Sequence, residues 1–84
     1  QDAAGRLASL LSRLAEDFGR EIEGGTVIDL VLTHQEIANL IGSSRVTVTK
    51  LINKFIDEGM ITIKKRKIII IDFELLGERL QTLF

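Results

Sequence analysis

The stretch from residue 32 to residue 58 constrains the fold more than any other part of the chain, because it predicts two helices joined by a tight turn. Thr33 can cap the first helix, and Glu36 three residues later completes a capping box that satisfies backbone N–H groups at a helix start. The apolar residues that follow, at helical spacing, are Ile37, Ala38, Leu40 and Ile41. A helix is therefore predicted to begin directly after Thr33.

The apolar pattern stops at Gly42, and a glycine tolerates the positive φ that turns one helix sharply into another. Ser43 or Ser44 can cap the second helix, which is predicted to cover residues 45–58. At about 100° per residue, one apolar stripe of this helix consists of Val48, Leu51, Ile52 and Phe55. The opposite face carries Arg45, Val46, Thr49, Lys50 and Asn53.

That second face suits the edges of base pairs. A guanidinium or ammonium group can donate to guanine O6 and N7, Asn and Thr can bond base edges, and the methyl groups of Val and Thr can contact the thymine methyl. Two helices of this kind around a glycine turn form a helix-turn-helix, whose second helix enters the DNA major groove. Outside such a motif, Arg45 and Lys50 would be read as solvated surface charges.

The remaining segments complete a small domain. Asp2 can cap a first helix whose apolar stripe contains Leu7, Leu10, Leu11, Leu14 and Phe18, and Gly19 is predicted to end it. Residues 20–25 are polar and are predicted to form a loop, and the alternation in residues 26–32 predicts a strand that leads into Thr33.

Gly59 is predicted to supply the C-cap of the second helix of the motif, and two apolar runs follow it. Residues 60–63 and 68–71 predict a β-hairpin whose tip is the basic run 64–67, with a turn type that the sequence leaves open. Asp72 can cap a last helix with an apolar side made of Phe73, Leu75, Leu76, Leu80 and Leu83 or Phe84. The predicted fold is α+β, a winged helix-turn-helix with a three-helix core, a short strand, a hairpin wing and an extra C-terminal helix, over residues 1–84.

The charges are strongly polarised along the chain, although the formal net charge is only −1. Residues 43–67 carry seven Lys or Arg against two acids, whereas residues 1–42 carry three against seven. Exposed charges act over about a Debye length, roughly 8 to 10 Å, so a basic face can bind phosphates on a domain that is acidic elsewhere.

The run LTHQEIANLIGSSRVTVTKLINKFIDEGMI resembles the helix-turn-helix of the Crp/Fnr family of transcription regulators, with its T-x-x-E-I-A, G-x-S-R and T-V-x-[RK]-x-[LI] segments. The upstream DAAGRLASLLSRLA resembles the D-x-x-x-R-[LI] helix of that family. The resemblance covers residues 2–71, and GSSRVTVTKLI is most similar to the global nitrogen regulators of cyanobacteria and plastids.

The resemblance places Arg45 and Lys50 at the two basic base-reading positions, and the exposed face adds Val46 and Thr49 to the predicted base-reading set. Val46 departs from the glutamate of many family members, which argues against the catabolite-activator half-site, and Lys50 replaces a more common arginine, which weakens a bidentate guanine contact. Phosphate contacts are predicted for Thr33, Gln35, Ser44 and Thr47 around the helix starts, and for Lys65 and Arg66 at the wing tip. Capping, solvation and, for the wing, protection against edge aggregation are the alternative roles of these residues.

The resemblance further implies a sequence-specific regulator that binds double-stranded DNA at a palindromic operator, forms a homodimer as a full-length protein, recruits RNA polymerase and works in the bacterial cytoplasm or the plastid stroma. The chain opens at a helix cap without the effector domain and long dimerisation helix of that family, so we expect a C-terminal fragment that is mostly monomeric. No cofactor is expected in this domain.

Two other classes of function fit the residues less well. A winged helix can instead bind a protein, but the exposed face of the second helix then ought to be apolar, and here it has one valine among basic and polar residues. An enzyme is disfavoured because no nucleophile, base and metal-ligand arrangement is recognisable, and Glu16, Asp17, Glu21 and Glu23 are interpreted as a solvated surface. The single histidine, His34, has no cysteine partner for a metal site and is predicted to be exposed.

Overall fold

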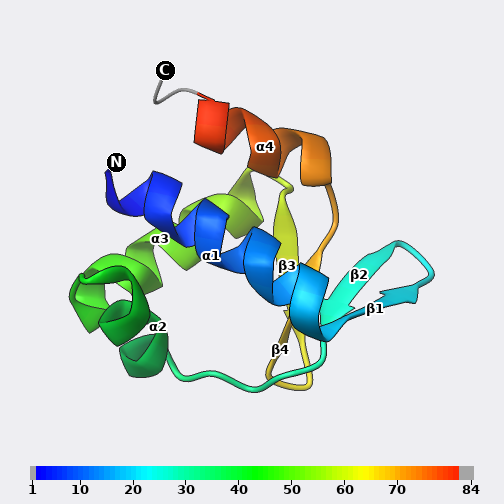
Figure 1. Ribbon diagram of the computed structural model, residues 1–84, viewed down its shortest axis with the longest axis horizontal. Helices are drawn as coiled ribbons and strands as arrows, with labels where there is room; N and C mark the ends of the chain where they lie inside the picture. The colour runs from blue at the N-terminus through cyan, green and yellow to red at the C-terminus, as the bar shows by residue number, and fades with distance from the viewer. Residues whose placement is uncertain (1, 82–84) are drawn as a thin grey trace.

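The computed structural model describes residues 2–81, and the side chains of residues 2–79. Within them four helices and a four-stranded antiparallel sheet follow one another along the chain (Figure 1). The elements are α1 (Ala3–Phe18), β1 (Gly19–Ile22), β2 (Gly25–Ile28), α2 (His34–Ile41), α3 (Arg45–Asp57), β3 (Ile61–Lys64), β4 (Lys67–Ile70) and α4 (Phe73–Gln81). The predicted α+β winged helix-turn-helix architecture is confirmed.

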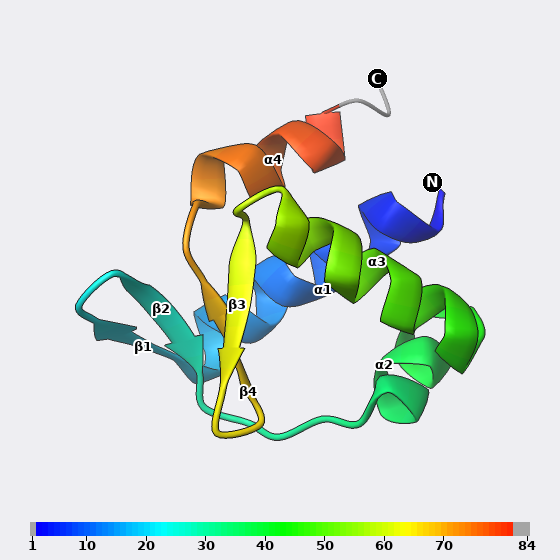
Figure 2. The ribbon, with the colours of Figure 1, turned by 180° about the vertical axis from the view of Figure 1, so that it is seen from behind.

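The helices pack on one another beside the sheet. α1 lies between α4 and the pair α2 and α3, and its C-terminal end reaches β1 and β2 (Figures 1 and 2). The connection from β2 to α2 runs past the tip of the β3–β4 hairpin before it enters the helix-turn-helix (Figure 2). The wing and the two helices of the motif therefore lie on neighbouring parts of the same domain.

One hydrophobic core receives side chains from all four helices and from three of the strands. Phe55, Leu7 and Leu11 are among its largest fully buried members, and no polar or charged residue in the described part of the chain is buried. The remaining buried apolar residues include Ile28, Ile37, Val48, Ile52, Met60, Ile61, Ile70 and Leu76. Removing this apolar area from water supplies the main driving force for folding.

α1 begins and ends where the sequence predicts. The Asp2 side chain accepts a hydrogen bond from the N–H of Gly5 at 2.7 Å, and Gly19 terminates the helix in an extended conformation. Phe18, however, is 45% exposed, so the predicted apolar stripe ends before it.

The predicted loop over residues 20–25 is wrong, because residues 19–22 form β1 and pair with β2 from Gly19↔Ile28 to Ile22↔Gly25. Gly24, with φ 89°, makes the turn between the two strands. β1 is an edge strand with almost every residue exposed, so its side chains carry no apolar alternation that would reveal it.

The strand predicted over residues 26–32 is shorter than expected and does not alternate. β2 ends at Ile28, where the N–H of Asp29 turns back to the carbonyl of Phe18 at 2.8 Å. Val27 and Ile28 are both buried, because β2 is an inner strand of the sheet between β1 and β4. Residues 29–33 form an irregular connection instead.

The wing is confirmed as the hairpin of β3 and β4, but its turn is shorter than the predicted tip. Lys64 pairs with Lys67, so only Lys65 and Arg66 form the turn, with φ of 52° and 68°. Positive φ at both central residues matches a type I′ turn, which usually uses Asn or Gly. β4 also pairs with β2 through Thr26↔Ile70 and Val27↔Ile69, so the short strand and the wing belong to one sheet.

The end of α3 and the start of α4 match their predicted positions closely. Glu58 is the C-cap of α3, and the predicted cap Gly59 follows it with φ 79°. Asp72 accepts a hydrogen bond from the N–H of Leu75 at 3.1 Å and so caps α4. Leu76 is buried, whereas Phe73 is 47% exposed, so its prediction as part of the apolar side is wrong. Leu83, Phe84 and the side chain of Leu80 lie outside the described residues.

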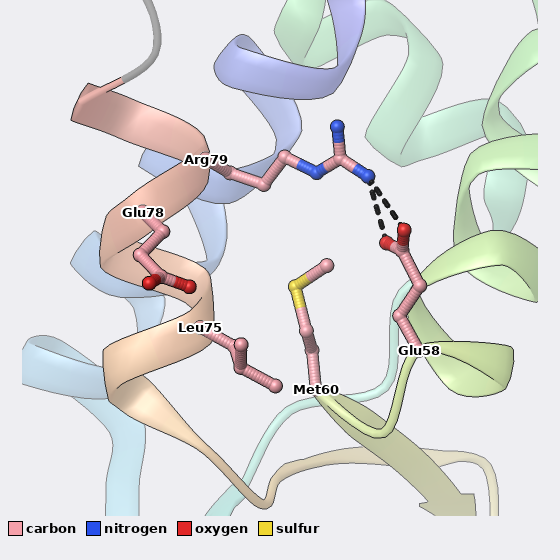
Figure 3. A pocket seen from close by; sticks show the side chains of 5 residues that line it. All are labelled: Glu58, Met60, Leu75, Glu78 and Arg79. Carbon is pink, nitrogen blue, oxygen red and sulfur yellow. Dashed lines mark hydrogen bonds and ion pairs between the residues drawn. The ribbon is translucent and has the colours of Figure 1, made fainter.

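An ion pair joins α4 to the end of α3. Arg79 Nη2 donates to both carboxylate oxygens of Glu58, at 2.7 and 3.0 Å, across a shallow pocket that Met60 and Leu75 line (Figure 3). The Arg79 guanidinium also lies 5.8 Å from the centre of the Phe55 ring, within the range of a cation–π contact. These contacts add to the burial of Leu76 in holding α4 against the core.

Two glycines, one in β2 and one in α4, offer a matched test of how tightly these elements pack. A Cβ on Gly25 would lie 2.4 Å from the carbonyl oxygen of Ile70, whereas a Cβ on Gly77 would meet nothing within 4 Å. We expect Gly25→Ala to lower the free energy of unfolding by about 1 to 3 kcal/mol through overpacking, and Gly77→Ala to raise it by about 0.5 to 1 kcal/mol within α4. Urea denaturation followed by circular dichroism measures both; a stable Gly25→Ala variant would contradict the register of β2 and β4.

Candidate nucleic-acid interface

The start of α2 is fixed by the predicted capping box. Thr33 Oγ1 accepts from the N–H of Glu36 at 3.0 Å, and a Glu36 carboxylate oxygen accepts from the N–H of Thr33 at 2.9 Å. The hydrogen bond from the Thr33 backbone, followed by that from its side chain, lowers the pKa of Glu36. Thr33 itself stays exposed, with its one hydroxyl hydrogen engaged by the Glu36 carboxylate.

The turn between α2 and α3 leaves Ser44, and not Ser43, as the cap of α3. Gly42 adopts φ 69° as predicted, and the N–H of Ser43 bonds back to the carbonyl of Ala38 at 2.9 Å. Ser44 Oγ accepts from the N–H of Thr47 at 3.1 Å and lies 2.9 Å from Thr47 Oγ1, to which it donates. The two predicted phosphate-contacting hydroxyls at this helix start are thus bonded to each other.

α3 is anchored through one face and exposed through the other. Val48, Ile52 and Phe55 are buried as predicted, while Leu51 is only half-buried. Arg45, Lys50 and Asn53 are exposed, and Val46 is 53% exposed. The structure therefore presents the predicted base-reading residues on one solvent-facing side of α3, with Thr49 half-buried at the margin of that side.

Thr49 and His34 form a contact that the sequence does not predict. His34 Nδ1 lies 2.7 Å from Thr49 Oγ1, and the bond ties the first residue of α2 to the middle of α3. His34 is half-buried, so its predicted full exposure is wrong. No local sequence pattern signals this contact, because the two residues are 15 positions apart in the chain.

Gln35 extends the same surface along α2. It is exposed, and its amide nitrogen donates to Asn39 Oδ1 at 2.9 Å one turn further on. An amide nitrogen carries two hydrogens, so this bond leaves one donor for a phosphate oxygen. Gln35 thus lies near Thr33 at the N-terminal end of α2.

The basic run of the wing divides into two parts. Lys64, Lys65 and Arg66 are exposed, whereas Lys67 is half-buried and forms an ion pair with Asp29 in the connection to α2. The hydrogen bond and charge of Lys67, with a smaller effect of Arg20, lower the pKa of Asp29. Lys67 therefore joins the wing to the connection between β2 and α2, and the other three cations of the run face solvent.

A groove brings the wing tip to the helix-turn-helix. Its lining includes Arg66 of the wing, Thr33 and His34 at the start of α2, and Ile52 of α3. Phosphate candidates from the wing and from α2 thus border one hollow beside the exposed face of α3, and Figure 2 shows the wing and α3 on the same side of the domain. Lys65 lies at the hairpin turn next to this groove.

Residues 2–81 hold no cluster of three His, Cys, Asp or Glu side chains able to hold a metal ion. None of the helices in that part of the chain is both long and apolar enough to cross a membrane.

A comparison with known protein families decides the identity of the fold. Residues 5–79 match the Crp-like helix-turn-helix domain, which is most of the chain. The chain belongs to this family. The match includes most of α1, the helix-turn-helix, the wing and most of α4, so the resemblance seen over residues 2–71 is confirmed.

Individual relatives agree with this assignment. A global nitrogen regulator of Nostoc is 48% identical over 68 residues, which cover 81% of this chain and 30% of the relative. A CRP/FNR-family transcriptional regulator of Thermus thermophilus superposes with a TM-score of 0.83 at 38% identity, covering 96% of this chain and 41% of that one. The CO-dependent transcription factor CooA of Carboxydothermus hydrogenoformans gives a TM-score of 0.86 at 34% identity, covering 94% and 37%.

The chain thus spans about a third of the length of the regulators it matches. The similarity to a nitrogen regulator confirms the predicted branch of the family. All three relatives are named as regulators and none as an enzyme, and the family together with these names supports a DNA-binding domain of a transcription regulator.

The ion pair of the wing yields a testable pH effect. Lys67→Ala should return the pKa of Asp29 to its ordinary value, because both the hydrogen bond and the nearby charge are lost. The folded-state pKa of Asp29 is depressed, so the pair stabilises the fold above the unfolded pKa, and this stabilisation disappears as the pH falls through the folded pKa. Carboxyl ¹³C titration by NMR measures the change. Lys64→Ala, which removes a wing cation outside this pair, should leave the pKa of Asp29 where it is.

Proposed function

We propose that this domain binds double-stranded DNA sequence-specifically, with α3 in the major groove. The observation that carries the proposal is the division of α3 in a Crp-like fold: a buried stripe holds the helix in place while Arg45, Val46, Lys50 and Asn53 stand exposed on the opposite face. A basic, hydrogen-bonding helix face on a rigid support is what direct readout of base edges requires.

Arg45 and Lys50 are proposed to donate to base acceptors, and the exposed methyl groups of Val46 to contact a thymine methyl. Thr49 is the fourth base-reading residue, at the edge of the face. Valine cannot accept a hydrogen bond from cytosine, so the central base pair of each half-site should be an A·T pair that the protein reads through apolar contact.

Phosphate contacts are proposed for Thr33 and Gln35 on α2, for Thr47 on α3, and for Lys65 and Arg66 on the wing. Phosphate oxygens only accept hydrogen bonds, so a useful side chain must have a donor left after its contacts within the protein. Gln35 and Thr47 meet that condition, and Thr33 meets it by turning its hydroxyl hydrogen from the Glu36 carboxylate to a phosphate, whereas the hydroxyl hydrogen of Ser44 is directed to Thr47. Ser44 is therefore proposed to act on phosphate through Thr47, which it orients.

The parent protein is proposed to be a homodimeric regulator that binds a palindromic operator, contacts RNA polymerase and works in a bacterial cytoplasm or a plastid stroma. The names of the relatives support regulation of transcription, and two-fold symmetry of a dimer would match a palindrome. A domain of this length supplies one half-site contact by itself.

The decisive experiment selects binding sites from a random duplex library at low salt with this 84-residue chain and then titrates salt on the enriched duplex. An enriched half-site whose affinity falls steeply with salt supports the proposal. A folded domain that enriches no sequence would contradict it and favour a protein-interaction module.

The two classes of contact should respond differently to substitution. Arg45→Ala should weaken the selected site by about 1 to 3 kcal/mol and flatten discrimination at one base pair. Lys65→Gln should weaken all duplexes alike and reduce the salt slope by about one. Fluorescence anisotropy on selected and scrambled duplexes separates the two, and identical behaviour of both variants would mean that the assigned roles are wrong.

The 84-residue chain is expected to be mostly monomeric and to bind its half-site weakly, because a second tethered half-site would add affinity through effective concentration. Sedimentation velocity at micromolar protein tests the first point. A tight dimer under those conditions would show that these residues contain a dimer interface of their own.

A further inference from the structure

The contact between α2 and the exposed side of α3 joins His34 to Thr49, a residue of the proposed base-reading set. His34 Nδ1 and Thr49 Oγ1 are 2.7 Å apart, and both side chains are half-buried. A serine or threonine hydroxyl in a helix has other options, because it can rotate and bond the carbonyl one turn back, and threonine therefore occupies two rotamers in helices. In this structure the Thr49 hydroxyl is held by His34 instead.

We propose that His34 is a positioning residue for base readout, which holds the Thr49 side chain in one rotamer and fixes whether its hydroxyl donates to DNA or accepts from it. The inference rests on the proposed function, because it assumes that α3 lies in the major groove. It assigns His34 a role in specificity that is separate from phosphate binding.

The fixed polarity follows from the hydrogen-bond inventory of the two groups. A hydroxyl has one hydrogen and two lone pairs, and each nitrogen of a neutral imidazole is either a donor or an acceptor. If Nδ1 lacks the proton, Thr49 donates to His34 and offers only lone pairs to DNA, which suits the exocyclic amine of adenine or cytosine. If Nδ1 carries the proton, Thr49 accepts from His34 and its own hydrogen can donate to thymine O4 or guanine O6.

The position of the His34 side chain is restricted by its surroundings, because it is half-buried and lines a groove. It borders the groove beneath the wing together with Arg66, and Thr33 and Glu36 of the capping box fix the backbone at the helix start that carries it. The ring is therefore supported by α2 and faces α3, so Thr49 has a stationary partner. A stationary partner is needed if a hydroxyl that could rotate freely is to discriminate between base pairs.

The first measurement needs no DNA. His34 is the only histidine of the chain, so its ring ¹⁵N signals assign themselves in an NMR spectrum. At a pH of about 8, we expect one predominant tautomer in the wild-type chain and a mixture in Thr49→Val. An equal mixture of tautomers in the wild-type chain would overturn the proposed polarity.

The second measurement uses the half-site obtained by selection and every single base-pair change within it. His34→Ala should lose about three- to tenfold of discrimination at one position, the loss expected for one hydrogen bond. Thr49→Val should lose discrimination at the same position, and the double variant should lose no more than Thr49→Val alone. The preferred base at that position should be the one that the observed tautomer predicts.

Two further variants distinguish positioning from stability or charge. His34→Asn keeps a hydrogen-bonding group near the place of Nδ1 and should restore most of the discrimination. Gln35→Ala, one residue along α2, should weaken all duplexes by the same factor. His34→Ala should leave the affinity for scrambled duplexes and the salt slope unchanged.

The inference fails alone if the wild-type chain binds its half-site and His34→Ala either discriminates as well as wild type or weakens every duplex equally. If the wild-type chain, shown to be folded by circular dichroism, binds no duplex, the proposed function and this inference fail together.

Discussion

The burial of one stripe of α3 is the constraint on which the rest of the structure depends. Val48, Ile52 and Phe55 are almost completely removed from water, and they are spaced so that a helix must place them on one side. With about 3.6 residues per turn, fixing that side also fixes which residues face outward. Hydrophobic burial therefore determines which residues of α3 face the solvent. No separate interaction has to orient Arg45 or Lys50.

The wing depends on the same core through the sheet. β4 pairs with β2 on one side and β3 on the other, and Ile61 and Ile70 are buried among the helices. The ion pair of Lys67 with Asp29 adds a second link, from the base of the turn to the segment that enters α2. Because an exposed ion pair contributes little stability, its larger effect is on where the wing tip lies relative to the helix-turn-helix.

Local signals could be read from the sequence, and long-range polar contacts could not. The caps at Asp2, Thr33 and Asp72, the turn at Gly42 and the stripe of α3 all depend on residues within a few positions of one another. The sequence does not reveal β1, because an exposed edge strand needs no apolar pattern, and it does not show that Phe73 is exposed, because periodicity does not show which turn of a helix reaches the core. The partners of His34 and Lys67 are distant in sequence, so only the folded chain brings them together.

A polar side chain on the exposed side of the helix-turn-helix can bond within the protein or to a ligand. Counting the hydrogens that remain after its bonds within the protein shows which of these it can do. Ser44 both accepts from the backbone of α3 and donates to Thr47, so its only hydrogen is used in holding the helix start. Thr47 accepts from Ser44 and retains its own hydrogen for another acceptor. The same reasoning applies to Thr49, whose hydroxyl hydrogen is free only if His34 Nδ1 carries the proton of the bond between them. A residue that the sequence predicts as a DNA contact can thus act by setting the chemistry of its neighbour, and hydrogen-bond direction, in addition to exposure, separates these two proposed roles.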